Sequence, residues 1–355
     1  MSEQDSQQNI PEPVPLVEVT RGSITESRHR GHIAVLDGDG HVVAHLGRPE
    51  TVTYLRSSAK PFQAIPLVAT GAADRFGFTA AEIALACASH NGEPLHVETA
   101  ASMLRKIGLD QSALKCGVHE PFSAEVVRRL RESGEPANVL QNNCSGKHAG
   151  MLALALHLGA PTETYDQPDN PVQLMIGRTI EQFSDVPLED IAVGIDGCGA
   201  PVFGVTVQAM ARMYARLVLP PESLDEETRE ACRRIVSAMN TYPEMIGGGL
   251  TERLDTEIMR TVRGRLVSKV GAEGVYTAGV LPCKEWPRGL GLAFKIEDGE
   301  DRRARPTVVI EALRQLGVLT DGAYEALKPY ASFVVRNHRG DHVGEVRAEF
   351  ELIKG

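Results

Sequence analysis

The first clear pattern of hydrophobic and polar positions along the chain lies between residue 31 and residue 46, where two apolar runs are separated by a polar turn. The apolar runs GHIAVL (31–36) and HVVAHL (41–46) flank the turn-forming sequence Asp37-Gly38-Asp39-Gly40. Two short apolar runs around an Asp-Gly turn are typical of a two-stranded antiparallel hairpin. The chain is therefore predicted to begin with sheet.

Helical periodicity dominates the next part of the chain, from about residue 58 to residue 185. Thr79 is followed three residues later by Glu82, the spacing of a capping box at a helix start, and residues 149–158 form a run of Ala and Leu. Strand patterns return afterwards, in IAVGID (191–196), RLVSKV (265–270), GLGLAFKI (289–296) and the alternating Val346, Ala348, Phe350 and Leu352.

The order of these patterns predicts an α+β fold in which both ends of the chain supply strands to one antiparallel sheet. We expect residues 1–16 to be a polar flexible tail and residues 17–355 to form one domain. Within that domain, an α/β lobe should comprise about 17–60 and 190–355, and a helical lobe about 61–189.

Composition narrows the class of partner. The chain has 355 residues and a formal net charge of -10, without a Lys/Arg-rich run. This argues against binding to nucleic acid or to an anionic membrane surface and favours a small-molecule substrate. Six dispersed cysteines read as reduced thiols, and the polar N-terminus lacks the pattern of a signal peptide, so a cytoplasmic protein is expected.

The segment RSSAKPFQ (56–63) contains the first candidate chemistry. Proline is tolerated only in the first turn of a helix, so Pro61 places a helix start near Ser57 or Ser58. Residues three apart share a helix face, which lets Ser57 meet Lys60 and turns Ser58 away. Ser57 is therefore the better nucleophile, with Lys60 as its base, although a Ser-x-x-Lys match alone also suits a helix cap beside a solvated lysine.

Two further motifs follow in order. Ser89-His90-Asn91 is a Ser-x-Asn element, and Lys269-Val270-Gly271 is a Lys-x-Gly element on a predicted strand. Together with Ser-x-x-Lys these are the three elements of penicillin-binding and β-lactamase-type sites, with Val where Thr is usual. Ser57 and Lys60 would then attack an acyl group, while Ser89 and Lys269 would relay a proton to the leaving nitrogen.

Longer blocks resemble a specific family, the asparaginase II family of thermolabile, rhizobial-type L-asparaginases. The resemblance covers residue 17 to the end, and its blocks are RSSAKPFQ, ASHNGEP (88–94), NNCSGKHAGM (142–151), GIDGCGAPVFG (194–204), Gly249 to Met259, and KVGAEGVY (269–276).

This resemblance implies a β-lactamase-like fold, a homodimer and hydrolysis of L-asparagine to L-aspartate and ammonia through an acyl-enzyme. It implies two catalytic pairs, Ser57 with Lys60 and Ser89 with Lys269. It also makes Arg56 and Asp196 essential polar neighbours, and we expect both of them, with Asn91, to bind the substrate.

Cys144 and Cys198 each lie in a Gly-rich turn beside polar residues. A lone cysteine is usually a small core residue, but two thiolates with one nitrogen ligand and a water would suit zinc. Spacing alone offers His148 as the nitrogen ligand, whereas the family resemblance implies Lys147. We expect such a zinc ion to be non-catalytic, because Ser57 and the lysines already supply nucleophile and bases.

Two other classes of function remain open at the level of sequence. One is a different Ser/Lys acyl-hydrolase, either a glutaminase or an enzyme acting on β-lactams or D-amino-acid peptides. The other is a non-catalytic amino-acid sensor on the same fold.

Overall fold

The computed structural model describes residues 12–250 and 253–355. Its strands are Val14–Arg21 (β1), Ile24–Asp37 (β2), Val42–Leu46 (β3), Val52–Tyr54 (β4), Ala192–Ile195 (β5), Pro201–Thr206 (β6), Leu266–Val270 (β7), Val275–Val280 (β8), Leu290–Ile296 (β9), Phe333–Arg336 (β10), His342–Ala348 (β11) and Ile353–Lys354 (β12).

Most of the α-helices lie in one continuous stretch of the chain between β4 and β5. They are Lys60–Ala69 (α1), Ala72–Arg75 (α2), Ala80–Ala86 (α3), Pro94–Lys106 (α4), Ala124–Ser133 (α5), Ser145–Leu158 (α6), Pro171–Ser184 (α7), Val207–Val218 (α8), Glu226–Thr241 (α9), Pro243–Ile246 (α10), Leu254–Val262 (α11), Ala304–Gln315 (α12) and Asp321–Ala331 (α13). The 3₁₀ turns are Arg56–Ala59 (η1), Gln111–Ala113 (η2), Val139–Gln141 (η3), Thr162–Thr164 (η4) and Leu188–Asp190 (η5).

The main sheet has the strand order β10-β11-β1-β2-β9-β8-β7, and β3 joins it by pairing with both β2 and β12. All of these pairs are antiparallel. The hairpin expected at residues 31–46 is present, with Ala34 opposite His45. The two ends of the chain meet where Val17 lies opposite Ala348, which confirms the predicted α+β fold with sheet from both termini.

Three details differ from the sequence expectations. The tail does not extend to residue 16, because β1 begins at Val14 and Leu16 is fully buried; residues 1–11 lie outside the described part of the chain. The strand expected at 191–196 is β5, but it belongs to a separate three-stranded sheet of order β4-β6-β5. Helix α9, from the expected α/β lobe, packs against α1 and α3 of the helical part because its buried face is apolar.

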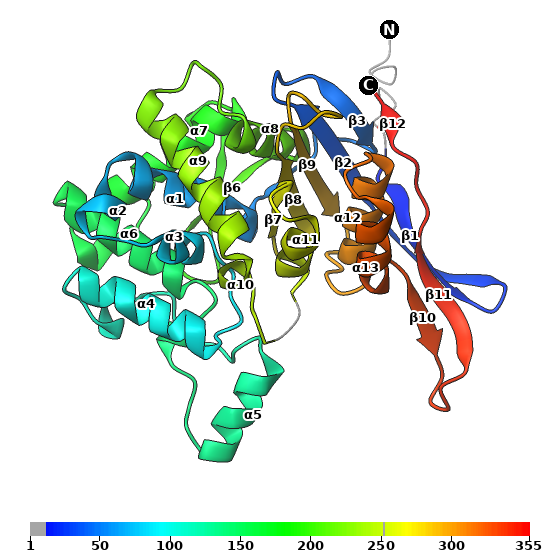
Figure 1. Cartoon of the computed structure of the whole chain (residues 1–355), viewed down its shortest axis with the longest axis horizontal. Helices are drawn as coiled ribbons and strands as arrows, with labels where there is room; N and C mark the ends of the chain where they lie inside the picture. Colours follow the sequence, from blue (N-terminus) through cyan, green and yellow to red (C-terminus); the bar gives the residue numbers. More distant parts are fainter. Residues whose placement is uncertain (1–11, 251–252) are drawn as a thin grey trace, which may run out of the picture.

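Helices cover the main sheet from both sides (Figure 1). Helix α8 packs on β2, β8 and β9, whereas α12 packs on β1, β8 and β11 with α13 against it. Close approach of α8 depends on Gly279 and Gly291, which face each other across β8 and β9, since a Cβ on either would clash with the α8 backbone. In the part of the chain that the structure describes, no helix combines the length and hydrophobicity needed to span a lipid bilayer.

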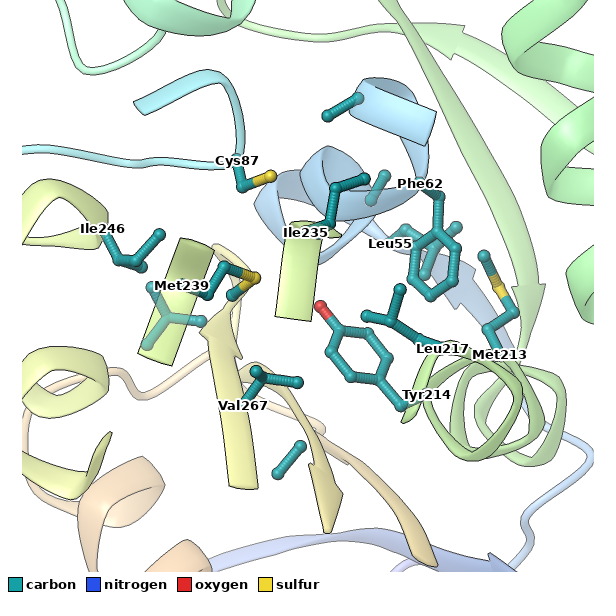
Figure 2. Packing of buried hydrophobic residues seen from close by; sticks show 14 of the residues in the cluster. Leu55, Phe62, Cys87, Met213, Tyr214, Leu217, Ile235, Met239, Ile246 and Val267 are labelled. Atoms are coloured by element: carbon teal, nitrogen blue, oxygen red, sulfur yellow. The ribbon is translucent and has the colours of Figure 1, made fainter. Parts of the chain in front are cut away.

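The apolar core continues between α1, α8, α9 and β7, where it fixes the short turn η1 (Figure 2). Phe62 of α1 packs edge-on against Tyr214 of α8, with ring centroids 5.3 Å apart. The Tyr214 hydroxyl donates a hydrogen bond of 2.8 Å to the Ser58 carbonyl. Leu55, immediately before η1, is fully buried in the same core. The core thus anchors the residues on both sides of Ser57.

Candidate active site

A cavity of about 320 Å³ contains the candidate nucleophile. It is bordered by residues that lie far apart in sequence, namely Ser57, Ser89, Phe122, Asn143, Arg253, Leu254, Val270, Gly271, Ala272, Asp301 and Arg305. Both serines predicted from the three motifs therefore face one space. The third motif contributes its Val and Gly to the same wall.

The backbone before Ser57 is held in an unusual conformation. Arg56 has a φ of 50°, in the left-handed region that non-glycine residues rarely adopt. Its Nε donates a 2.9 Å hydrogen bond to Asp196 Oδ1, and Glu273 lies 3.9 Å from its Nη1. Arg56 and Asp196 are thus each other's partners, and this ion pair helps to hold the strained turn that presents Ser57.

The neighbouring serine has a structural contact. Ser58 is completely buried, and its hydroxyl donates a 2.7 Å hydrogen bond to the Leu55 carbonyl. Its side chain is therefore turned into the core, while Ser57 lines the cavity.

Lys60 is 1% exposed, so it is not a solvated lysine. Its Nζ donates to the Ser89 hydroxyl at 2.9 Å and to the carbonyls of Ala88 and Asn143 at 2.6 and 3.1 Å. None of these three acceptors is Ser57. In the structure, Lys60 is therefore paired with Ser89 and not with Ser57.

Lys269 of β7 is also fully buried, and its Nζ lies 3.4 Å from Asp255 Oδ2 and 3.2 Å from the Val270 carbonyl. Burial lowers the pKa of Lys269 to about 7; the nearby cations Lys60 and Arg253 add to this effect, and Asp255 opposes it. Gly271 allows this strand end to approach η1, because a Cβ there would meet the Leu55 carbonyl at 2.8 Å. Lys269 is thus a buried amine that can be neutral near physiological pH.

A match to the family model for L-asparaginase II extends over residues 17–348, nearly the whole chain. The chain belongs to the L-asparaginase II family. Membership makes it a hydrolase that acts on amides. Among curated protein sequences, a search finds no match.

Solved structures with a similar course of the chain include a glutaminase from Bacillus subtilis in covalent complex with 5-oxo-L-norleucine. It is 14% identical, with a TM-score of 0.38, and the alignment covers 88% of this chain and 93% of that one. A β-lactamase from Burkholderia ambifaria is 15% identical with a TM-score of 0.37, over 81% of this chain and 95% of that one.

In this L-asparaginase II family member, the candidate zinc ligands lie together at the start of α6. Lys147 Nζ is 2.9 Å from Cys198 Sγ. The neighbouring Cys198 thiol, together with Lys60 and Lys147, holds the pKa of Cys144 well below its usual value despite burial. The two thiols are ligands that zinc prefers, whereas Lys147 would have to bind as the neutral amine. Burial tends to lower the pKa of Lys147, but Cys144 and Cys198 raise it above its usual value, so a bound zinc ion would have to displace a proton from this amine.

His148, the alternative nitrogen ligand, lies beside this cluster and is fully buried. Its Nδ1 bonds to the Tyr165 hydroxyl at 2.7 Å, and its Nε2 has no hydrogen-bond partner among the described residues. Burial lowers the pKa of His148 to about 4, so the ring is neutral. Both nitrogen donors are therefore near the thiols.

In this family member, Asp196 interacts both with the turn that carries Ser57 and with the cysteine cluster: Arg56 is its hydrogen-bond partner, and Lys147 acts on it through space. Burial tends to raise the pKa of Asp196, but Lys147, the Gly197 N–H and Arg56 together hold it below its usual value. Its carboxylate is therefore ionised and lies under the influence of both the cysteine cluster and the Ser57 turn.

Sequence reasoning missed two charged residues of the site, both within the block Gly249 to Met259. Asp255 is 1% exposed and accepts hydrogen bonds from Val270 N and Ser268 Oγ, each at 3.1 Å, as well as contacting Lys269. Arg253 lines the cavity and donates to the Asn91 side chain and the Ser89 carbonyl. The sequence signal for these two residues is that Arg253 and Asp255 lie at the start of an apolar helical segment. Their partners in the structure lie far away in sequence, so this signal did not identify them as site residues.

The pH dependence of activity should follow Lys269. Because its pKa is about 7, the neutral amine forms above that pH, and a reaction that uses it as a base should accelerate. We expect kcat/KM for amide hydrolysis to rise about tenfold per pH unit below pH 7 and to level off above it. Initial rates between pH 5 and 9 measure this.

The substitution Asp255→Asn provides the matched test of the same profile. It removes a carboxylate that raises the pKa of Lys269, so the midpoint should move to lower pH. A maximum near pH 6 followed by a decline through pH 7 would show that the reaction does not use neutral Lys269.

Proposed function

We propose that this protein hydrolyses L-asparagine to L-aspartate and ammonia through an acyl-enzyme on Ser57. The observation that carries the proposal is one small cavity lined by two serine hydroxyls, one of them bonded to a buried lysine. Family membership supplies the reaction class, hydrolysis of an amide.

The first step is attack of Ser57 Oγ on the side-chain amide carbon. Its proton passes to neutral Lys269, whose pKa of about 7 suits a base at physiological pH. The sequence suggested Lys60 for this role. We assign the role to Lys269 because Lys60 Nζ contacts Ser89 and two carbonyls, whereas burial lowers the pKa of Lys269 to about 7.

The second step breaks the carbon–nitrogen bond. Ser89 Oγ gives a proton to the leaving nitrogen and recovers one from Lys60 Nζ, to which it is already hydrogen-bonded. Ammonia leaves and an ester to Ser57 remains. Water then cleaves this ester, its proton returns to Lys60, and Lys269 restores the Ser57 hydroxyl, so the charges balance over one turnover.

We further propose that Cys144, Cys198 and Lys147 hold zinc. Lys147 is preferred over His148 because Lys147 Nζ lies 2.9 Å from a thiol, while His148 is oriented by Tyr165. Bound zinc would supply a fixed positive charge that organises the pocket. In this proposal the residues that perform the chemistry are Ser57, Ser89 and the two buried lysines, and Asp196 binds the substrate's ammonium group.

Metal removal should therefore weaken binding more than chemistry. Chelation, or Cys198→Ser, is expected to raise KM several-fold and to leave kcat within roughly a factor of ten, the pattern of lost ground-state binding. Steady-state kinetics with metal content measured in parallel provide the check, with Cys232→Ser as the control for removing a buried thiol elsewhere. An unchanged KM with abolished kcat in the metal-free protein runs against this assignment.

The function itself is tested by ammonia release from L-asparagine and L-glutamine and by cleavage of a chromogenic β-lactam, each with and without chelator. We expect L-asparagine to be the preferred substrate. Preference for glutamine or the β-lactam would support the other acyl-hydrolases. Binding of asparagine without any release of ammonia would identify a sensor.

A further inference from the structure

More positively charged than negatively charged side chains border the cavity beside Ser57. Arg253, Arg305 and Asp301 are the charged residues that border it. Arg305 Nη1 donates to Asp301 at 2.6 Å and to the Gly271 carbonyl at 2.8 Å, so these two charges neutralise each other. Arg253 is left as the excess positive charge of the cavity wall.

Arg253 is held by neutral groups. Its Nη1 donates to Asn91 Oδ1 at 3.0 Å, and its Nη2 donates to the Ser89 carbonyl at 3.1 Å. The guanidinium also lies over the ring of Phe122, 5.4 Å from the centroid. These contacts fix the plane of the guanidinium next to the second serine of the site and leave it charged.

The carboxylates that influence Arg253 through space are committed to other partners. Asp255 binds Lys269, and Asp301 binds Arg305. Glu93 accepts hydrogen bonds from the backbone N–H groups of Gly249 and Leu250. Among the residues that the structure describes, Arg253 therefore has no carboxylate within ion-pair distance.

A fixed guanidinium in a cavity wall is suited to bind a carboxylate, because its planar set of donors matches the two carboxylate oxygens. The volume of about 320 Å³ is at the small end for ligand pockets and suits one free amino acid. A ligand whose amide carbon reaches Ser57 would bring its remaining groups against the surrounding wall.

We propose that Arg253 binds the α-carboxylate of the substrate and thereby restricts the enzyme to free amino-acid amides. This inference rests on the proposed function and adds the residue that selects the substrate class. An asparagine whose carboxylate is blocked, as inside a peptide, would leave the Arg253 charge unpaired in the wall and would bind weakly.

The test compares two ligands that differ only in this carboxylate. L-asparagine and L-asparagine amide, in which the carboxylate is replaced by a neutral amide, are titrated calorimetrically into Ser57→Ala protein, which prevents turnover. Adding Arg253→Gln should weaken binding of L-asparagine at least about tenfold and change that of the amide by less than about threefold. Arg253→Lys, which keeps the charge but loses the planar donor pair, should give an intermediate and equally selective loss.

The double variant Arg305→Gln with Asp301→Asn is the matched control, since it removes a neutral ion pair from the same wall and should affect both ligands alike. Equal weakening of both ligands by Arg253→Gln, or no weakening of either, overturns the inference, as does absence of amino-acid binding to Ser57→Ala. Melting temperatures show whether the variants are folded.

The two proposals fail in different experiments. If the parent protein binds L-asparagine selectively through Arg253 but releases no ammonia, the proposed function is wrong and the inference stands. If ammonia is released but Arg253→Gln does not discriminate between the ligands, only the inference is wrong.

Discussion

Replacing Ser57 by alanine is expected to reduce the rate of ammonia release from L-asparagine by at least about a thousandfold, the scale seen when a serine hydrolase loses its nucleophile. The reason is geometric as well as chemical. Ser57 is the serine of the RSSAKPFQ segment that borders the cavity, and the strained Arg56 backbone and the buried core hold it there. No other hydroxyl at this turn faces the substrate space.

Ser58→Ala is the matched control, one residue away. Its hydroxyl is committed to the Leu55 carbonyl, so its loss should cost about 1 kcal/mol of the free energy of unfolding and leave the turnover number within a few-fold. Mass spectrometry of the acid-quenched parent enzyme should locate the acyl group on the peptide that contains Ser57. Equal loss of activity in both variants, or an acyl group on Ser89, would assign the nucleophile elsewhere.

Lys269→Met should lower kcat by at least about a hundredfold and should remove the increase in activity near pH 7, because the substitution deletes the base that titrates there. Lys60→Met should cause a loss of similar size, since Ser89 then lacks the group that returns its proton. Both losses should appear in kcat more than in KM, as the lysines act on protons in the reaction and not on binding.

Removal of Lys269 also leaves Asp255 buried without its cation, which destabilises the fold. The double variant Lys269→Met with Asp255→Asn removes both charges and separates unfolding from loss of the base. Lys295→Met, on β9 two strands away from β7 and outside the cavity, is the control for losing a lysine from the sheet. Near-normal turnover in a folded Lys269→Met protein would remove this lysine from the mechanism.

The sequence by itself determined much of the fold. The hairpin of β2 and β3, the capping box at Thr79 and Glu82, and the strands β7 and β9 all follow from patterns within a few residues, because side-chain periodicity and turn chemistry are local properties. Proline at position 61 likewise predicted a helix start near Ser57 or Ser58. The 3₁₀ turn η1 covers these residues, and α1 follows from Lys60 with this proline in its first turn.

The sequence was less informative where an outcome depended on pairing between distant segments. The strand at 191–196 was expected, but its membership of a second small sheet depends on β4 and β6, which it meets only in the folded chain. The start of β1 at Val14 was missed because Pro11, Pro13 and Pro15 obscure its pattern, and the strand is recognised by its pairing with β2.

Only the tertiary structure shows which of the candidate site residues contact one another. Local spacing set Lys60 beside Ser57, yet the hydrogen bond of Lys60 goes to Ser89, 29 residues away. The lowered pKa of Lys269 arises from burial among charges on other elements, and Arg253 meets Asn91 across 162 residues. Sequence motifs specify which chemical groups are present. Only the packing of the folded chain fixes the distances between these groups and excludes water from them. The proposed proton transfer and carboxylate binding depend on those distances and on the exclusion of water.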